Sequence, residues 1–218
     1  CAPQMARTRR PTGALLRFRV NPRLVCERFI RRIAVLGAVL FALLGAPAIA
    51  GVDDPPLVAA AKVGDAEAVS RLLGSGDDVE TPDWAGWSSL VWAALRLHDE
   101  VIEVLLDAGA DIEAIGHGGK NSGTALMMAA KKVGGLETMN LLLDRGAAID
   151  GTDQYGRTAL MIAAKHGRTE NITFLLDRGA NPNARSQLEK SPTALALAHA
   201  HGHAAAARLL DEAGAHEQ

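Results

Sequence analysis

Apolar and polar residues recur at helical spacing along residues 55–218, and the same pattern returns every 33 to 37 residues. In its second occurrence a first apolar run, LVWAAL, is followed by a polar break, RLHDE, and by a second apolar run, VIEVLL. Apolar positions spaced by three and four residues indicate a helix with one buried face. Each run is only about two helical turns long. The pattern therefore predicts pairs of short helices joined by tight turns.

Two recurring residues set the register of these units. The leading leucine recurs as Leu57, Leu90, Leu126, Leu160 and Leu195, and the closing glycine recurs as Gly76, Gly109, Gly146, Gly179 and Gly214. They divide the chain into five units, at about residues 55–81, 83–115, 116–151, 153–185 and 186–216. A single unit leaves its apolar face exposed, so neighbouring units must stack to form a core.

Hydroxyl side chains mark where the first helix of a unit begins. A Ser or Thr at this position is a favourable N-cap, because its oxygen accepts a hydrogen bond from an otherwise unpaired backbone amide. The predicted N-caps are Ser88, Thr124, Thr158 and Thr193. Gly64, Gly167 and Gly202 are predicted to end the first helix in their units. The first unit opens with Pro55-Pro56 without a turn before it, and the last unit has Asp211 where its neighbours have a leucine, as expected for the caps of an array.

These residues resemble the ankyrin repeat family over about residues 55–215. The run D-Q-Y-G-R-T-A-L-M-I-A-A-K-H-G, from Asp153 to Gly167, matches its pattern best. The sequence departs from the pattern where Ser or Ala replaces the proline after the cap, and where Val, Met or Ala replaces the following histidine. The resemblance implies an all-α solenoid of about five helix-turn-helix units with hairpin-like connecting turns. It also implies a concave groove, made of inner helices and turn tips, that holds another protein.

The first fifty residues have a different composition. They hold nine arginines and one acid, a balance of +8, whereas residues 51–218 hold 14 basic and 24 acidic residues, a balance of −10. Residues 28–50 join an arginine flank to the uncharged run IAVLGAVLFALLGAPAIA. The A-I-A ending predicts a signal peptide cleaved after Ala50, and the alternative is an uncleaved signal anchor. Residues 1–27 are interpreted as a basic segment that is disordered or mis-assigned upstream of the true start.

Both interpretations place the ankyrin-like residues 51–218 outside the cytoplasm, either periplasmic or secreted, or anchored in the inner membrane and facing the periplasm. After signal cleavage no membrane insertion is expected. Cys1 and Cys26 both precede the cleavage point, so the mature chain is expected to have neither disulfides nor cysteine-bound metals.

The sequence predicts a chain that is not an enzyme and has no cofactor. No H-E-x-x-H or G-x-S-x-G motif is present, and Gly116–Lys120 fails as a phosphate loop because Asn121 follows the lysine. His199, His201 and His203 alternate in sequence and so do not share one helix face. A His-rich metal or ligand carrier, with His216 joining them, therefore stays an alternative, while no metal site is assigned.

Aromatic and basic residues supply the candidate binding positions. Three tryptophans fall within nine residues, of which Trp92 is expected to pack inside; Trp84 and Trp87 in the turn either pack on a neighbour or form an exposed anchor. The last two positions of successive inner helices carry strong bases, including Lys62. These bases either line up toward the groove or are there only because positive charge is favourable at the C-terminal end of a helix dipole. The candidate partner-binding residues are Trp84, Trp87, Arg96, Lys131, Lys132, Tyr155, Arg157, Lys165 and His166.

The most direct hypothesis is an exported bacterial protein-binding module of the cell envelope. It is expected to act as a monomer, to bind a protein with an acidic segment and to bind no nucleic acid. Support for peroxide defence and inhibition of an envelope toxin by an immunity-type protein are two roles that the sequence does not separate.

Residues 115–123 form a longer connection than the equivalent turn before Thr158, and they are predicted to project as a finger.

Overall fold

The computed structural model describes residues 54–116, 122–187 and 192–216. Within these residues the chain forms ten short helices and no strand, and the all-α solenoid of five helix-turn-helix units is confirmed. The predicted basic segment and signal sequence, residues 1–50, lie outside the described residues. Nowhere in the described part does a helix reach the length and apolar character that crossing a membrane requires.

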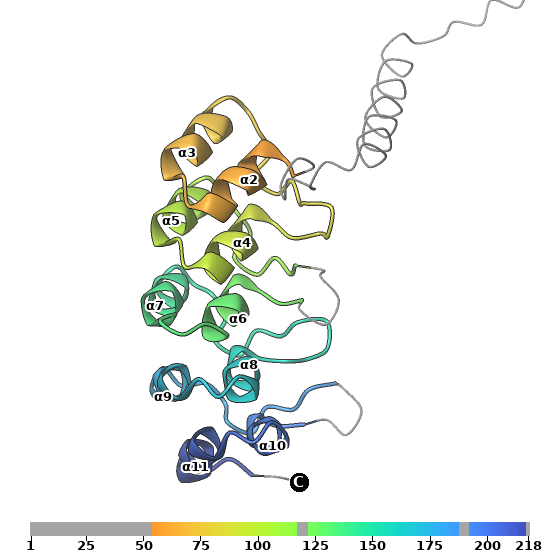
Figure 1. The fold of residues 1–218 in the computed structure, drawn as a ribbon, viewed down its shortest axis with the longest axis vertical. Coiled ribbons are helices and arrows are strands. Elements are labelled where there is room, and N and C mark those ends of the chain that lie inside the picture. The colour runs from red at the N-terminus through yellow and green to blue at the C-terminus, as the bar shows by residue number, and fades with distance from the viewer. Residues whose placement is uncertain (1–53, 117–121, 188–191, 217–218) are drawn as a thin grey trace, which may run out of the picture. The chain divides into compact units, whose positions relative to one another are not determined.

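The helices alternate between two columns (Figure 1). The inner column consists of α2 (Pro56–Val63), α4 (Ser89–Arg96), α6 (Ala125–Ala130), α8 (Ala159–Lys165) and α10 (Ala194–Ala200). The outer column consists of α3 (Ala66–Gly74), α5 (Asp99–Asp107), α7 (Leu136–Asp144), α9 (Thr169–Asp177) and α11 (Ala204–Glu212). Each helix packs on the next one of its own column and on its partner in the same unit.

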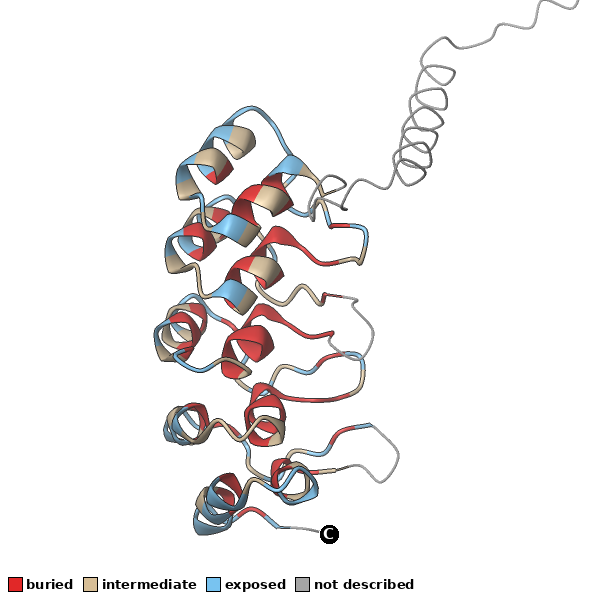
Figure 2. Ribbon diagram, viewed as in Figure 1, coloured by how far each residue is buried: buried red, intermediate tan, exposed pale blue. Residues whose placement is uncertain are grey.

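The core runs between the two columns as one continuous layer (Figure 2). All five leading leucines are buried, and each inner helix also buries at least one alanine that lies three or four residues after its leucine. These small side chains let neighbouring inner helices approach closely, while larger residues of the outer helices, such as Ile102, Met139 and Ile172, fill the space between the columns. The core therefore needs few aromatic residues.

The predicted helix boundaries are confirmed at both ends. The hydroxyl oxygens of Ser88, Thr124, Thr158 and Thr193 each accept a hydrogen bond from the backbone amide three residues later. Gly64, Gly167 and Gly202 adopt positive φ angles after their inner helices. In the second unit Leu97 takes this place with φ 62°, a conformation that is costly for a residue with a β-carbon.

A ladder of hydrogen bonds joins consecutive units where each outer helix gives way to the connecting turn. In each of the first four units, the residue four positions after the closing glycine has a side-chain oxygen that accepts a hydrogen bond. The donor is a backbone amide of the next unit, two positions after the closing glycine of that unit. The pairs are Glu80 with Asp111, Glu113 with Ala148, Asp150 with Asn181 and Asn183 with His216, at 2.7 to 3.0 Å. Because every link is made across a unit boundary, the ladder fixes the spacing of the stack.

Candidate binding surface

The turn that precedes α4 is organised by a buried carboxylate. Asp83 Oδ1 accepts the backbone amides of Ala85 and Trp87 at 2.9 Å, and its Oδ2 accepts the indole N–H of Trp92 at 2.8 Å. Burial by itself raises the pKa of Asp83, but the hydrogen bonds from Trp87, Trp92, Ala85 and Lys62 outweigh it and leave the pKa below 3.8. The carboxylate is therefore ionised at neutral pH and holds the turn in shape.

Only one of the two turn tryptophans is available at the surface. Trp84 is 84% exposed, as an aromatic anchor requires. Trp87 is only 7% exposed, and its ring lies 4.9 Å from that of Trp92. Of the two alternatives for Trp87, the structure therefore shows packing and not an exposed anchor: its ring is buried against Trp92, and its backbone amide donates a hydrogen bond to Asp83. Trp92 is half-buried against Trp87, as expected.

The equivalent turn before α8 repeats this arrangement with different side chains. Asp153 accepts the backbone amides of Tyr155 and Arg157 at 2.9 Å, and its second oxygen accepts the Arg157 Nε–H at 2.6 Å. Arg157 also donates to the carbonyl of Ser122 in the preceding unit at 3.0 Å. Arg157 is thus buried and joins two units, which corrects its assignment to partner contact. Tyr155 stays half-buried beside it, with the guanidinium 5.1 Å from the ring centre.

The strong bases at the ends of the inner helices differ in their surroundings, and Lys62 is already paired. Lys62 Nζ lies 2.7 Å from Asp54 and 3.4 Å from Asp83, and 4.2 Å from the centre of the Trp92 ring. This lysine therefore serves the packing of the first two units and is not free to bind a partner.

The remaining bases gather at the ends of α6 and α8. We call Lys131, Lys132, Lys165 and His166 the basic cluster. All four side chains are half-buried, and in the described part of the chain no carboxylate lies within ion-pair distance of any of its lysines. Arg96, at the end of α4, is exposed and likewise has no ion pair among the described residues.

The electrostatics of the cluster show how closely its members are placed. Burial lowers the pKa of Lys131 below 10.5, and the charges of Lys165, Lys132 and Arg157 lower it further. Burial also lowers the pKa of His166 from 6.5 to about 4, with added repulsion from Lys131, Lys165, Arg168 and His201. At neutral pH the cluster thus combines three ammonium groups with one neutral imidazole, and it concentrates positive charge in a domain of overall negative charge.

The backbone carbonyls at the ends of α6 and α8 already have hydrogen-bond partners, which are side chains of the following unit. Arg168 Nε donates to the Lys131 carbonyl at 2.9 Å, and the Asn171 amide donates to the carbonyls of Ala130 and Lys132 at 2.8 Å. A ring nitrogen of His203 lies 3.1 Å from the Lys165 carbonyl. These contacts were missed from the sequence. Lysines at the C-terminal end of a helix often donate hydrogen bonds to its last carbonyls. Here Arg168, Asn171 and His203 contact these carbonyls instead.

Two histidines near the C-terminus, His201 and His203, contact backbone carbonyls of inner helices. His201 Nδ1 contacts the Leu197 carbonyl at 2.9 Å, while His203 covers Gly167 and bonds to α8 as described. Residues 54–116, 122–187 and 192–216 contain no group of three His, Cys, Asp or Glu side chains placed to hold a metal ion.

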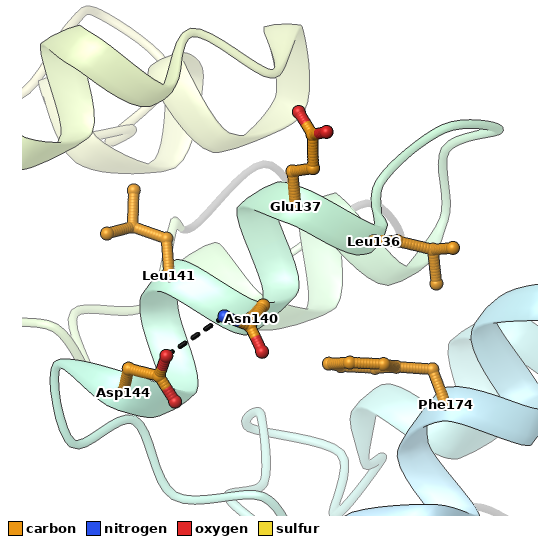
Figure 3. A pocket seen from close by; sticks show the side chains of 6 residues that line it. All are labelled: Leu136, Glu137, Asn140, Leu141, Asp144 and Phe174. Atoms are coloured by element: carbon orange, nitrogen blue, oxygen red, sulfur yellow. Dashed lines mark hydrogen bonds between the residues drawn. The ribbon is translucent and has the colours of Figure 1, made fainter.

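A pocket of about 420 Å³ lies on the outer column between α7 and α9 (Figure 3). Leu136, Leu141 and Phe174 give it an apolar lining. Two of its polar side chains are paired, because Asp144 accepts a hydrogen bond from Asn140 at 2.9 Å and forms an ion pair with Arg178.

Comparison with known proteins agrees with this architecture. Two stretches, residues 33–116 and 114–186, match the family described as ankyrin repeats, in three copies, and together they span most of the chain. The chain belongs to the ankyrin repeat family.

The finger predicted in one of its connections is described only at its base, where Gly116 and Gly123 form an antiparallel bridge.

Several curated proteins share these ankyrin repeats. The mitochondrial disaggregase of Bos taurus is 45% identical over 58 residues, 27% of this chain and 9% of that protein. Ankyrin repeat domain-containing protein 40 of Mus musculus is 42% identical over 57 residues, 26% of this chain and 16% of that protein. Inversin of Danio rerio is 35% identical over 88 residues, 40% of this chain and 8% of that protein. The matched part of the chain thus spans less than a fifth of the length of each of these relatives.

Ankyrin repeats are protein–protein interaction modules and are generally without enzymatic activity, and the match is to this binding family and to no enzyme family. The relatives compared are eukaryotic proteins, so they do not bear out a bacterial, exported origin. Within the ankyrin framework, the candidate surface is reduced to Trp84, Arg96, Tyr155 and the basic cluster.

Proposed function

We propose that the chain holds a partner protein through the ends of its inner helices in units two to four, and that the partner contributes an acidic segment. The observation that carries the proposal is the basic cluster. Its three lysines have no carboxylate partner among the described residues and no helix terminus left to satisfy. Like charges held close together without such a role raise the free energy of the folded chain, and an anionic partner relieves that cost.

Capture of partners from an envelope extract, followed by binding measurements with charge-reversed variants, tests this function. Replacing Lys131 and Lys132 by Glu is expected to lower the association rate at least severalfold, and the wild-type rate is expected to fall steeply with added salt. Replacing Glu100 and Glu103 on the outer helix α5 by Lys is the matched control and is expected to leave the rate nearly unchanged. If both double variants bind the captured partner equally well, the basic cluster is not the binding site.

The cell envelope is the location that we propose for this activity. The arginine flank, the uncharged run of residues 33–50 and the A-I-A ending support export, with Gly51 as the mature N-terminus. N-terminal sequencing of the protein from an envelope fraction tests this, and a chain beginning upstream of Arg28 would favour an anchor instead. The identity of the captured partner separates the two proposed roles, because a toxin indicates immunity and a catalase indicates peroxide defence.

A further inference from the structure

His166 is the one member of the basic cluster whose charge can change near physiological pH. It follows α8 as the C-cap residue, is half-buried, and within the described residues its ring makes no hydrogen bond. Three helices, α6, α9 and α10, pack against α8. The groups that act on His166 come from all of these elements: Lys131 follows α6, Lys165 ends α8 itself, Arg168 precedes α9 and the His201 ring follows α10.

This environment keeps the imidazole neutral in the free protein. Burial is the first cause of the lowered pKa of His166, and repulsion from Lys131, Lys165, Arg168 and His201 is the second. Protonation would bring no compensating bond to the end of α8, because the Lys165 carbonyl already has its partner in His203. The ring therefore stays uncharged until the field around it changes.

An acidic segment changes that field in two ways. Carboxylates that pair with Lys131 and Lys165 neutralise two of the charges that oppose a proton on the ring. A carboxylate beside the imidazole also accepts a hydrogen bond from its N–H, and such a bond is stronger when the donor is charged. Both effects favour the imidazolium form in the complex over the free protein.

We infer that an acidic segment enters the basic cluster together with one proton, which His166 takes up, so that the site holds its partner more tightly in mild acid than at neutral pH. This regulation rests on the proposed function, because it requires an anionic partner at the cluster. It adds to that function a dependence on the pH of the compartment, and it assigns the dependence to a single side chain.

The test uses the full chain and a fluorescent peptide of six aspartates as the probe, with affinities measured between pH 7.5 and 5.0. If binding restores the pKa of His166 from about 4 to 6.5, linkage predicts an affinity increase of up to about 25-fold over this range. The arginines of residues 1–50 stay charged throughout, so their contribution does not vary with pH. Calorimetry at pH 5.5 in two buffers of different ionisation enthalpy is expected to show uptake of nearly one proton.

Variants assign the effect to its residue. His166→Gln is expected to lose most of the affinity increase and of the proton uptake, whereas His201→Gln, at the equivalent place in the next unit, is expected to retain most of both. In the free and bound wild type, the NMR titration of the His166 ring reports the change directly. A His166→Gln profile that matches the wild type overturns the inference while the proposed function stands. A probe that binds equally well to the Lys131→Glu/Lys132→Glu variant removes both.

Discussion

Two neighbouring serines at the start of α4 are expected to have opposite effects on stability. Ser88 is the N-cap, and its hydroxyl oxygen accepts the Val91 amide. Ser89 is fully buried, and its hydroxyl has no hydrogen-bond partner in the described structure. At the place of Ser89 the three following units have Ala125, Ala159 and Ala194, all buried. Alanine therefore fits this position without a change of packing.

The magnitudes follow from these environments. Ser89→Ala removes a buried, unpaired hydroxyl, whose burial costs roughly 1–3 kcal/mol, and replaces it by a better helix former. We expect the free energy of unfolding to rise by about 1 kcal/mol. Ser88→Ala removes a cap and is expected to lower it by about 1 kcal/mol. For a domain of this size, such changes correspond to shifts in melting temperature of roughly 2–4 °C in opposite directions.

Urea denaturation followed by circular dichroism measures both variants against the wild type, and an unchanged slope with denaturant shows that the comparison is valid. A lower midpoint for Ser89→Ala would refute the reasoning, because it would mean that the hydroxyl makes a stabilising contact. Equal effects of the two substitutions would show that the local geometry of the cap and of the buried position does not control stability.

Three further predictions test other parts of the structure. Gly167→Ala is expected to destabilise the chain more than Gly202→Ala in the same urea assay: both have positive φ, which costs about 1–2 kcal/mol for alanine, but only at Gly167 does the new β-carbon meet a side chain, the His203 ring at 2.6 Å. Asp83→Ala is expected to lower the unfolding free energy by about 2–4 kcal/mol, since it leaves buried amide and indole donors unpaired and Lys62 without one of its partners; an effect below about 1 kcal/mol would contradict this role. Wild-type stability is expected to fall as the pH drops from 6.5 toward 4, because the unfolded chain binds a proton at His166 before the folded chain does; thermal melts of His166→Gln should show a shallower decline.

The repeat pattern was sufficient to predict the fold, because the signals that define it are local. The caps at Thr124, Thr158 and Thr193 require only a hydroxyl and an amide three residues later, and the leading leucines mark the register of the inner helices. The candidate site was harder to predict, because exposure depends on contacts made across the turns. Trp87 and Arg157 occupy positions where the ankyrin pattern suggests a turn-tip side chain, yet both are buried.

A shared signal precedes both buried residues. Asp83 and Asp153 stand four residues before Trp87 and Arg157, and each carboxylate accepts the amide of that residue. An aspartate at this spacing can form the turn that directs the later side chain inward. The bonds from Arg168 and Asn171 to the end of α6 span 37 to 41 residues. They depend on how far one unit is displaced from the next, which no local pattern specifies.

The ladder that links each unit to its neighbour gives the assembly of the chain a direction. Each acceptor, from Glu80 to Asn183, is made before the amide that it will bind, because that amide belongs to the following unit. During synthesis every completed unit therefore presents an anchoring point to the unit that emerges next. Unfolding the first or the last of the five units breaks one such link, whereas unfolding an internal unit breaks two. Opening of the stack is thus expected to begin at either of these outer units and to advance inward one unit at a time.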